Sequence, residues 1–333
     1  MLINAPRRRV VTSIAAGGLA TTGIVNAQAQ PSNWPQPNKP IRIFVGFVPG
    51  GTTDPYARVY GEVLSRKLGV PVVVENRPGA GGMVALQTLA REAPDGHTIG
   101  ITTSSSLWGA RALYKKMPYD ADRDFAPLGW FPVGPLLMAV PASLPVNSVQ
   151  EWVEYAKKTP VTMASYNPAS VPHLAAEEFN KRYGTKVNVV HYKGEGPQWV
   201  DVATGVVQAG IGSYVALTAH IARGSVKVLA SVGPERSPKL PQVKSFVSQG
   251  FDGEIFRLAG GLLMVAPAAT PEPILQRISQ IFSEGSDDPK AASLRENFAI
   301  EDKPTTRDEA VRKWREEAPV WIKLTQSLGI TLA

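Results

Sequence analysis

The stretch IRIFVGFVPGGTTDPYARVYGEVLSRKL, residues 41–68, joins an apolar run to an amphipathic run through a glycine-rich loop. Residues 41–47 are mostly apolar and rich in β-branched side chains, which is typical of a strand. Residues 54–68 repeat apolar side chains at helical spacing, so that one face carries Tyr56, Val59, Tyr60, Val63 and Leu64. The stretch therefore predicts a strand, a loop and a helix, which is the building unit of α/β folds.

The same alternation continues along the chain. Further strands are expected at residues 70–75, 97–103, 161–165, 187–191, 206–211 and 226–231, and helices at 83–92, 149–158, 174–183, 198–204, 214–223, 274–282 and 307–328. Strands that alternate with helices predict βαβ units with a parallel sheet. The pattern restarts after residue 148, so we expect two α/β units, linked through residues 136–140 and again near 262–265, with a cleft between them.

The first thirty residues differ in composition from the rest. Arg7, Arg8 and Arg9 precede an uncharged, largely apolar run, and small residues follow at Ala27 and Ala29. A positive start, a short apolar middle and a small-residue exit are typical of a secretory signal peptide. Glycine and threonine dilute the run too much for a transmembrane helix. We therefore expect residues 1–29 to be cleaved on export to the periplasm.

Composition excludes several classes of chemistry. The chain has no cysteine, which excludes disulfides, thiolate catalysis, cysteine-held metals and a lipid anchor on cysteine. The net charge of +7 falls to +4 without the three arginines of the signal peptide, and no basic cluster follows them, so nucleic acid is not an expected partner. The four histidines, His97, His173, His191 and His220, stand singly.

Nucleotide and hydrolase motifs are incomplete or missing. The run at residues 46–53 has Thr52 where a phosphate-binding loop requires lysine, and the glycine pattern from Gly79 ends on Val84. The sequence contains no G-x-S-x-G and no H-E-x-x-H. No catalytic group, metal or cofactor is therefore expected.

Three loops that follow expected strands are rich in hydrogen-bond donors. They lie at residues 49–54, 102–106 and 165–173, and they combine glycine, threonine, serine and asparagine ahead of a helix. Glycine lets the backbone approach a ligand, and the start of a helix attracts an anion. Because α/β proteins bind ligands at the carboxyl ends of parallel strands, the three loops together predict one site for an anion.

Several blocks of sequence resemble a known family. Lys39-Pro40-Ile41-Arg42, Asn76-Arg77-Pro78-Gly79-Ala80-Gly81-Gly82, and Arg236-Ser237-Pro238-Lys239-Leu240-Pro241 resemble Bug-type receptors, the periplasmic solute-binding proteins of tripartite tricarboxylate transporters. The likeness spans nearly all of the chain after residue 29. It implies an α/β, two-lobed periplasmic-binding-protein fold (Venus flytrap, type II) with two hinge-crossing segments, in which residues 30–139 and 256–333 form one lobe and 140–255 the other.

The resemblance also implies a function. Such a receptor holds a small carboxylate between two closing lobes and delivers it to a cognate membrane permease, without catalysis and as a monomer. The residues expected to hold the ligand are Val48, Pro49, Gly50, Gly51, Thr52, Thr53, Asp54, Thr103, Ser104, Ser105, Ser106, Ser165, Asn167, Ala169, Ser170, His173, Gly212 and Ser213.

Two departures from the family pattern bear on the ligand. Gly212 stands where family members commonly carry aspartate, and Gly261 stands where they usually carry a bulky aromatic residue. Loss of the acid removes repulsion of a second carboxylate, and loss of the ring opens space that Trp108, Trp130, Phe256 and Arg257 would line. These departures predict an aromatic dicarboxylate such as terephthalate. The alternatives are an aliphatic di- or tricarboxylate and, from another class, a secreted α/β enzyme acting on carboxylate compounds.

Overall fold

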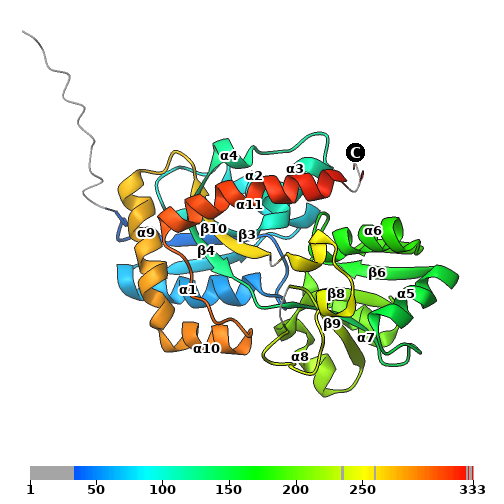
Figure 1. Cartoon of the computed structure of the whole chain (residues 1–333). Coiled ribbons are helices and arrows are strands. Elements are labelled where there is room, and N and C mark those ends of the chain that lie inside the picture. Colours follow the sequence, from blue (N-terminus) through cyan, green and yellow to red (C-terminus); the bar gives the residue numbers. More distant parts are fainter. Residues whose placement is uncertain (1–33, 234–235, 259, 328, 330–331, 333) are drawn as a thin grey trace, which may run out of the picture. The chain divides into compact units, whose positions relative to one another are not determined.

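The computed structural model describes residues 34–233, 236–258, 260–327, 329 and 332. The predicted signal peptide lies outside the described residues. In these described ranges, ten strands form two five-stranded sheets (Figure 1). The first has the order β2 (Val72–Asn76), β1 (Ile41–Val45), β3 (Thr98–Thr103), β10 (Gly261–Pro267), β4 (Phe125–Pro132), and the second has β7 (Val187–His191), β6 (Val161–Ser165), β8 (Ala209–Ser213), β5 (Leu136–Pro141), β9 (Val226–Ser231).

Each sheet contains the expected parallel βαβ units, but it also contains antiparallel pairs and is therefore mixed. β1 pairs in parallel with β2 and β3, and β6 does so with β7 and β8. β10, however, runs antiparallel to β3 and β4, and β5 runs antiparallel to β8 and β9. The chain crosses from one sheet to the other into these two strands. Leu262 pairs with Thr103 and Leu136 with Ser213, so each crossing strand starts where a parallel strand ends, and it must run backwards.

The segments expected to be links are therefore central strands. All residues of β5 and of β10 are buried, because each strand has a neighbour on both sides and helices over its faces. The expected division of the lobes after residue 139 would cut β5 in two, whereas the second sheet starts at Leu136. Between β4 and β5 the chain crosses within residues 133–135.

Helices cover both sheets (Figure 1). Beside the first sheet lie α1 (Thr53–Leu68), α2 (Met83–Leu89), α3 (Ala110–Leu113), α4 (Ala121–Asp124), α9 (Glu272–Glu284), α10 (Pro289–Asn297) and α11 (Arg307–Ser327). Beside the second lie α5 (Val149–Lys158), α6 (Val171–Tyr183), α7 (Glu195–Thr204) and α8 (Tyr214–Ala222). The helix expected at 54–68 is confirmed, with Tyr56, Tyr60, Val63 and Leu64 buried.

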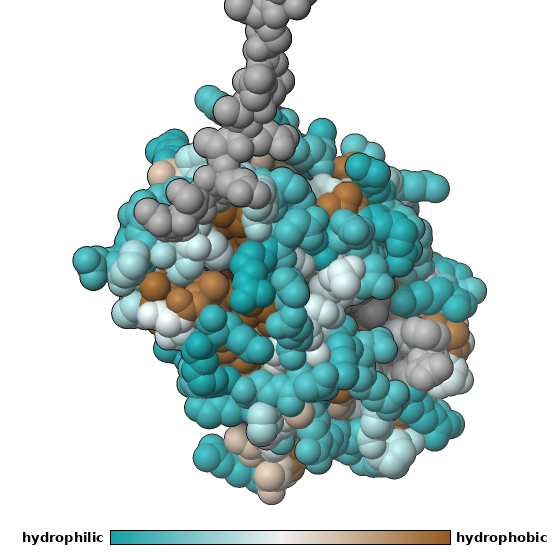
Figure 2. Space-filling view, turned by 90° about the vertical axis from the view of Figure 1, so that its left-hand side faces the viewer, coloured by the Kyte–Doolittle hydropathy of each residue, from teal (hydrophilic) through white to brown (hydrophobic). Residues whose placement is uncertain are grey.

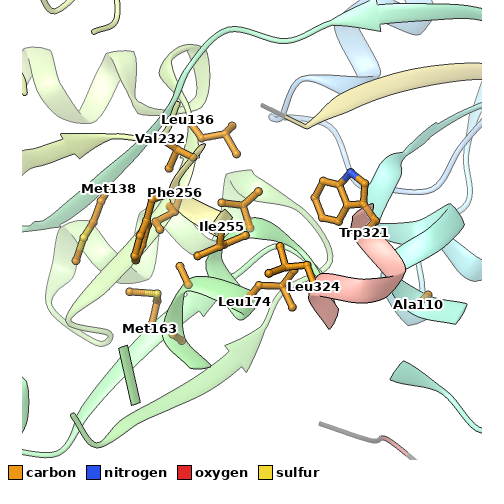
Figure 3. Packing of buried hydrophobic residues seen from close by; sticks show 14 of the residues in the cluster. Ala110, Leu136, Met138, Met163, Leu174, Val232, Ile255, Phe256, Trp321 and Leu324 are labelled. Carbon is orange, nitrogen blue, oxygen red and sulfur yellow. The ribbon is translucent and has the colours of Figure 1, made fainter. Parts of the chain in front are cut away.

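One hydrophobic cluster is shared by the two sheets. It contains Phe44 and Trp108 from the first sheet and its connections, and Met138 and Phe179 from the second side. The helix α11 supplies Trp321 and Leu324 to the same cluster, and Figure 3 shows Leu324 beside Leu174 of α6. The two α/β units therefore share apolar packing as well as two crossings of the chain.

The face drawn in Figure 2 is mostly polar. Figure 2 shows a face on which hydrophilic residues predominate and apolar residues lie in separate areas between them. No described helix combines the length and the apolar character that spanning a membrane requires.

Candidate functional site

A cavity lies where loops from the two sheets meet. It contains about 620 Å³ of space between protein atoms, solvent at its mouth included. The described residues that line it are Phe47, Val48, Gly51, Thr52, Thr53, Thr103, Ser104, Ser105, Val133, Leu136, Tyr166, Val171, Gly194, Glu195, Gly260, Gly261, Leu262 and Trp321. The lining comes from the start of α1, the end of β3 and both crossing segments. The cavity therefore lies at the carboxyl ends of the parallel strands, where the sequence analysis expects a ligand.

The first wall of the cavity is the start of α1. Gly50 adopts a φ of 105°, which glycine accepts at little cost, and the chain then enters the helix through Gly51 and Thr52. The first N–H groups of a helix have no partner within the helix and form an anion-binding end. Gly51, Thr52 and Thr53 line the cavity, so these donors are placed beside it.

Asp54 does not line this wall. Its carboxylate accepts hydrogen bonds from Arg58 Nε, at 2.8 Å, and from Asn76 Nδ2, at 2.9 Å. The aspartate thus carries out a supporting role, in which it fixes the start of α1 and is neutralised by Arg58. Asp54 therefore adds no uncompensated negative charge to this wall.

The second wall consists of hydroxyl groups after β3. Thr103 Oγ1 is 2.9 Å from Ser105 Oγ and 2.9 Å from Ser106 Oγ. The chain continues as a π-helical turn, Ser105–Gly109, a geometry that often occurs at functional sites. Thr103, Ser104 and Ser105 line the cavity, whereas Ser106 donates to the carbonyl oxygen of Gly81 at 2.6 Å.

Two hydrogen-bonded contacts join the sheets next to the cavity. Asn167, which follows β6, donates from Nδ2 to Ser105 Oγ at 3.1 Å and to Ser106 Oγ at 3.4 Å. The N–H of Val48 donates to the carbonyl oxygen of Lys193 at 3.1 Å. The two α/β units are therefore in contact through the loops that the sequence assigns to the ligand.

The third predicted loop, residues 165–173, satisfies most of its polar groups internally. Ser165 Oγ is 2.8 Å from Ser170 Oγ, and the N–H of Ala169 donates to His173 Nδ1 at 3.0 Å. Burial lowers the pKa of His173 to about 4, so it stays neutral and keeps this acceptor. From this loop, Tyr166 and Val171 line the cavity instead.

Glu195, the first residue of α7, is a site residue that the sequence analysis missed. It is 8% exposed and lines the cavity. Its Oε1 accepts a hydrogen bond from the N–H of Ser213 at 3.0 Å, and its Oε2 accepts one from Ser213 Oγ at 2.5 Å. Burial raises the pKa of the carboxyl, and the two bonds from Ser213 oppose that shift. A single glutamate at the start of a helix is so common that the sequence alone does not mark it as a site residue.

The space expected beside Gly261 is already filled. A Cβ placed on Gly261 would lie 2.0 Å from Cζ2 of Trp130, and that indole stacks on Trp108 with ring centroids 6.1 Å apart. Phe256 packs on Phe246 in the second unit, with centroids 4.5 Å apart. The apolar side chains that do line the cavity are Phe47, Val133, Leu136, Val171, Leu262 and Trp321.

The predicted residues thus divide into two groups. Val48, Gly51, Thr52, Thr53, Thr103, Ser104 and Ser105 line the cavity. Pro49, Gly50, Asp54, Ser106, Ser165, Asn167, Ala169, Ser170, His173, Gly212 and Ser213 lie outside the lining and support or join the loops that form it. In the described part of the chain no three histidine, aspartate or glutamate side chains are grouped to hold a metal.

Comparisons with known proteins agree with this arrangement. The family model "Tripartite tricarboxylate transporter family receptor" matches residues 56–330. BugT of Bordetella pertussis is 34% identical over 269 residues, which cover 80% of this chain and 81% of BugT. The solved periplasmic binding protein BugD has a TM-score of 0.81 at 27% identity and is matched over 89% of this chain and 100% of its own. The structure of R. palustris Rpa4515 with adipate has a TM-score of 0.82 at 29% identity, covering 90% of this chain and 100% of that one.

These matches confirm the periplasmic-binding-protein fold and the resemblance to Bug-type receptors. They also decide between the receptor and the secreted enzyme, because the family consists of transport receptors that bind solutes without transforming them. The chain belongs to the family of tripartite tricarboxylate transporter receptors, the periplasmic solute-binding proteins of these transporters.

Proposed function

We propose that this receptor captures a small aliphatic carboxylate between its two α/β units and delivers it to the permease of its transporter. The observation that carries the proposal is the wall formed by the start of α1 and the hydroxyls of Thr103, Ser104 and Ser105. Among the described lining residues there is no lysine, arginine or histidine, so neutral donors would hold the carboxylate. Charge-assisted bonds contribute about 1.5–3 kcal/mol each, so three or four contribute about 5–12 kcal/mol, a range that includes the free energy of micromolar binding, about −8 kcal/mol.

The relative crystallised with adipate, Rpa4515, supports an aliphatic ligand for this chain. Neither of the two sequence arguments for the aromatic dicarboxylate terephthalate, the space beside Gly261 and the missing acid at Gly212, holds in the structure. Trp130 occupies the space beside Gly261, and a Cβ on Gly212 would lie 3.1 Å from Glu195 Oε1, so an acid already stands at the place expected to be free of charge. We further propose that the chain is cleaved after residue 29 and that the receptor acts as a monomer.

A ligand panel tests the function. Isothermal titration calorimetry and thermal unfolding with acetate, succinate, adipate, citrate, benzoate and terephthalate should show saturable binding and stabilisation by one or more aliphatic acids, with no turnover of the acid. Stabilisation rises with ligand concentration when the ligand binds only the folded state. Binding of terephthalate alone would contradict the aliphatic class. Carboxylate capture would be contradicted if neither this panel nor L-aspartate and L-leucine showed binding.

The hydrogen bonds of Asn167 to Ser105 and Ser106 are expected to contribute to ligand affinity. Asn167→Ala removes these bonds between the units without changing the cavity lining, so the closed arrangement loses about 1 kcal/mol. Affinity is reduced when the binding-competent state is less populated, and we expect about a fivefold weaker Kd in calorimetry.

Asn180→Ala is the matched control. Asn180 accepts from the N–H of Val187 at 2.8 Å and from Thr185 Oγ1 at 2.9 Å, within the second unit. This variant should lose unfolding free energy and keep the Kd of the unaltered protein. An unchanged Kd in a folded Asn167→Ala protein would show that the contact does not assist binding.

A further inference from the structure

The cavity lining also contains an acidic side chain, Glu195, in addition to the hydrogen-bond donors of the loops. Glu195 and Tyr166 line the cavity, and Ser213 lies behind Glu195. A Cβ placed on Gly51 would be 3.4 Å from Glu195 Oε2, so the carboxyl lies close to the start of α1. A ligand carboxylate held by α1 would therefore have its neighbouring substituents near this acid.

The bonds of Glu195 are those of an ionised carboxylate. An N–H group can only donate, so Oε1 accepts from the backbone of Ser213. Ser213 Oγ donates to Oε2 and accepts from the N–H of Ala216 at 3.4 Å, so both oxygens of Glu195 act as acceptors. Glu195 is also the first residue of α7, where the positive end of the helix favours negative charge.

No cation of the protein balances this charge inside the cavity. Glu195 is the one acidic side chain among the described lining residues, and no basic side chain accompanies it there. The influences on its pKa are burial, which is the largest, and the two bonds from Ser213. Tyr166 is its titratable neighbour, and the charge of Glu195 adds to the effect of burial in raising the pKa of that phenol.

A buried carboxylate without a cation is costly unless a partner compensates it. The carboxylate of Glu195 would repel a second carboxylate of the ligand, whereas an ammonium group of the ligand would balance its charge. We propose that Glu195 makes this receptor selective for carboxylates that carry a protonated amine, that is, zwitterionic amino acids, over the same acids without the amine. The proposal rests on the proposed function, because the carboxylate of the ligand is held by the donor loops.

Matched pairs of probes test it. Calorimetry at pH 7.5 would compare L-aspartate with succinate, and L-leucine with 4-methylpentanoate, since each pair differs by one ammonium group. We expect the amino member to bind at least 10-fold more tightly in at least one pair. Glu195→Gln keeps the size and the acceptor for the N–H of Ser213, and it should reduce that preference below threefold.

The pH dependence gives an independent measurement. The amine stays protonated below pH 8, whereas Glu195 becomes neutral as the pH falls through its raised pKa, so the preference should decline on acidification and begin to do so above the usual carboxyl range. The Glu195→Gln protein should show no such decline. Glu154→Gln, which removes an exposed acid on α5, is the control and should keep both the preference and its pH dependence.

The outcomes separate the two proposals. Tight binding of succinate or 4-methylpentanoate with no gain from the amine would overturn the role of Glu195 and leave carboxylate capture intact. A preference that survives Glu195→Gln in a protein with a cooperative thermal transition would also overturn it. Silence of all four probes and of the carboxylate panel would overturn the proposed function, and this inference with it.

Discussion

Replacing Gly261 by alanine is expected to reduce the free energy of unfolding by about 3 kcal/mol. The added Cβ would lie 2.0 Å from Cζ2 and 2.2 Å from Cε2 of Trp130, so the indole must move. It has little room, because Trp108 stacks on it and Trp314 packs edge-on against Trp108 with centroids 5.3 Å apart. Urea denaturation followed by circular dichroism measures the loss as a lower midpoint at an unchanged slope.

Gly260→Ala is the control for this expectation. A Cβ on Gly260 first meets Trp321 Cζ2 at 3.6 Å, an ordinary contact, so that variant should keep the midpoint of the unaltered protein within about 0.5 kcal/mol. The cause can be isolated with Trp130→Leu: in the double variant the cost of Gly261→Ala should shrink, because its steric partner is gone. Equal stability of Gly261→Ala and the unaltered protein would refute the overlap.

Replacing Gly51 by valine is expected to weaken carboxylate binding by about 100-fold or more, equivalent to about 2.8 kcal/mol. A Cβ on Gly51 already reaches ordinary contact with Glu195, 3.4 Å from Oε2 and 3.6 Å from Cγ. The two further methyl groups of valine would extend from the start of α1 into the cavity, in front of the backbone N–H groups that are expected to hold the ligand carboxylate. Calorimetry with the tightest ligand of the panel measures the loss.

Gly51→Ala gives the graded comparison. Its single methyl group fits, and Gly51 is not among the glycines of positive φ, so this variant should fold normally and lose only part of the affinity. Thermal unfolding of both variants without ligand should show transitions close to that of the unaltered protein. Full affinity in a folded Gly51→Val protein would remove the start of α1 from the binding site.

The sequence predicts the α/β units well because their strands and helices carry strong local patterns. The helix at Thr53–Leu68 and the strand at Ile41–Val45 follow directly from apolar spacing. The direction of β5 and β10 has no such signal, since a central strand is apolar whichever way it runs. β4, Phe125–Pro132, was not predicted because Pro127, Gly129 and Pro132 interrupt its apolar pattern.

The candidate site is predictable only where glycine and hydroxyl groups stand before a helix. That rule finds the loop at Gly51–Thr53 and the residues from Thr103 to Ser105. It gives the same signal for residues 165–173, where Ser165 and Ser170 bond to each other at 2.8 Å and lie outside the cavity lining. Whether a donor faces a cavity or its own loop depends on tertiary packing. Glu195 becomes visible only when the fold brings it to Ser213, eighteen residues away in sequence.

The position of β10 also determines the order in which the molecule can be completed. The second sheet is built from one continuous segment, which ends with β9 at Ser231. The first sheet lacks the strand between β3 and β4 until residues 261–267 are available, so β3 and β4 each present an open edge until then. During synthesis from the amino end, all strands of the second sheet are therefore available before β10 can complete the hydrogen bonding of the first sheet. During that interval the unpaired backbone of β3 and β4 is the part of the nascent protein most exposed to mispairing with other chains.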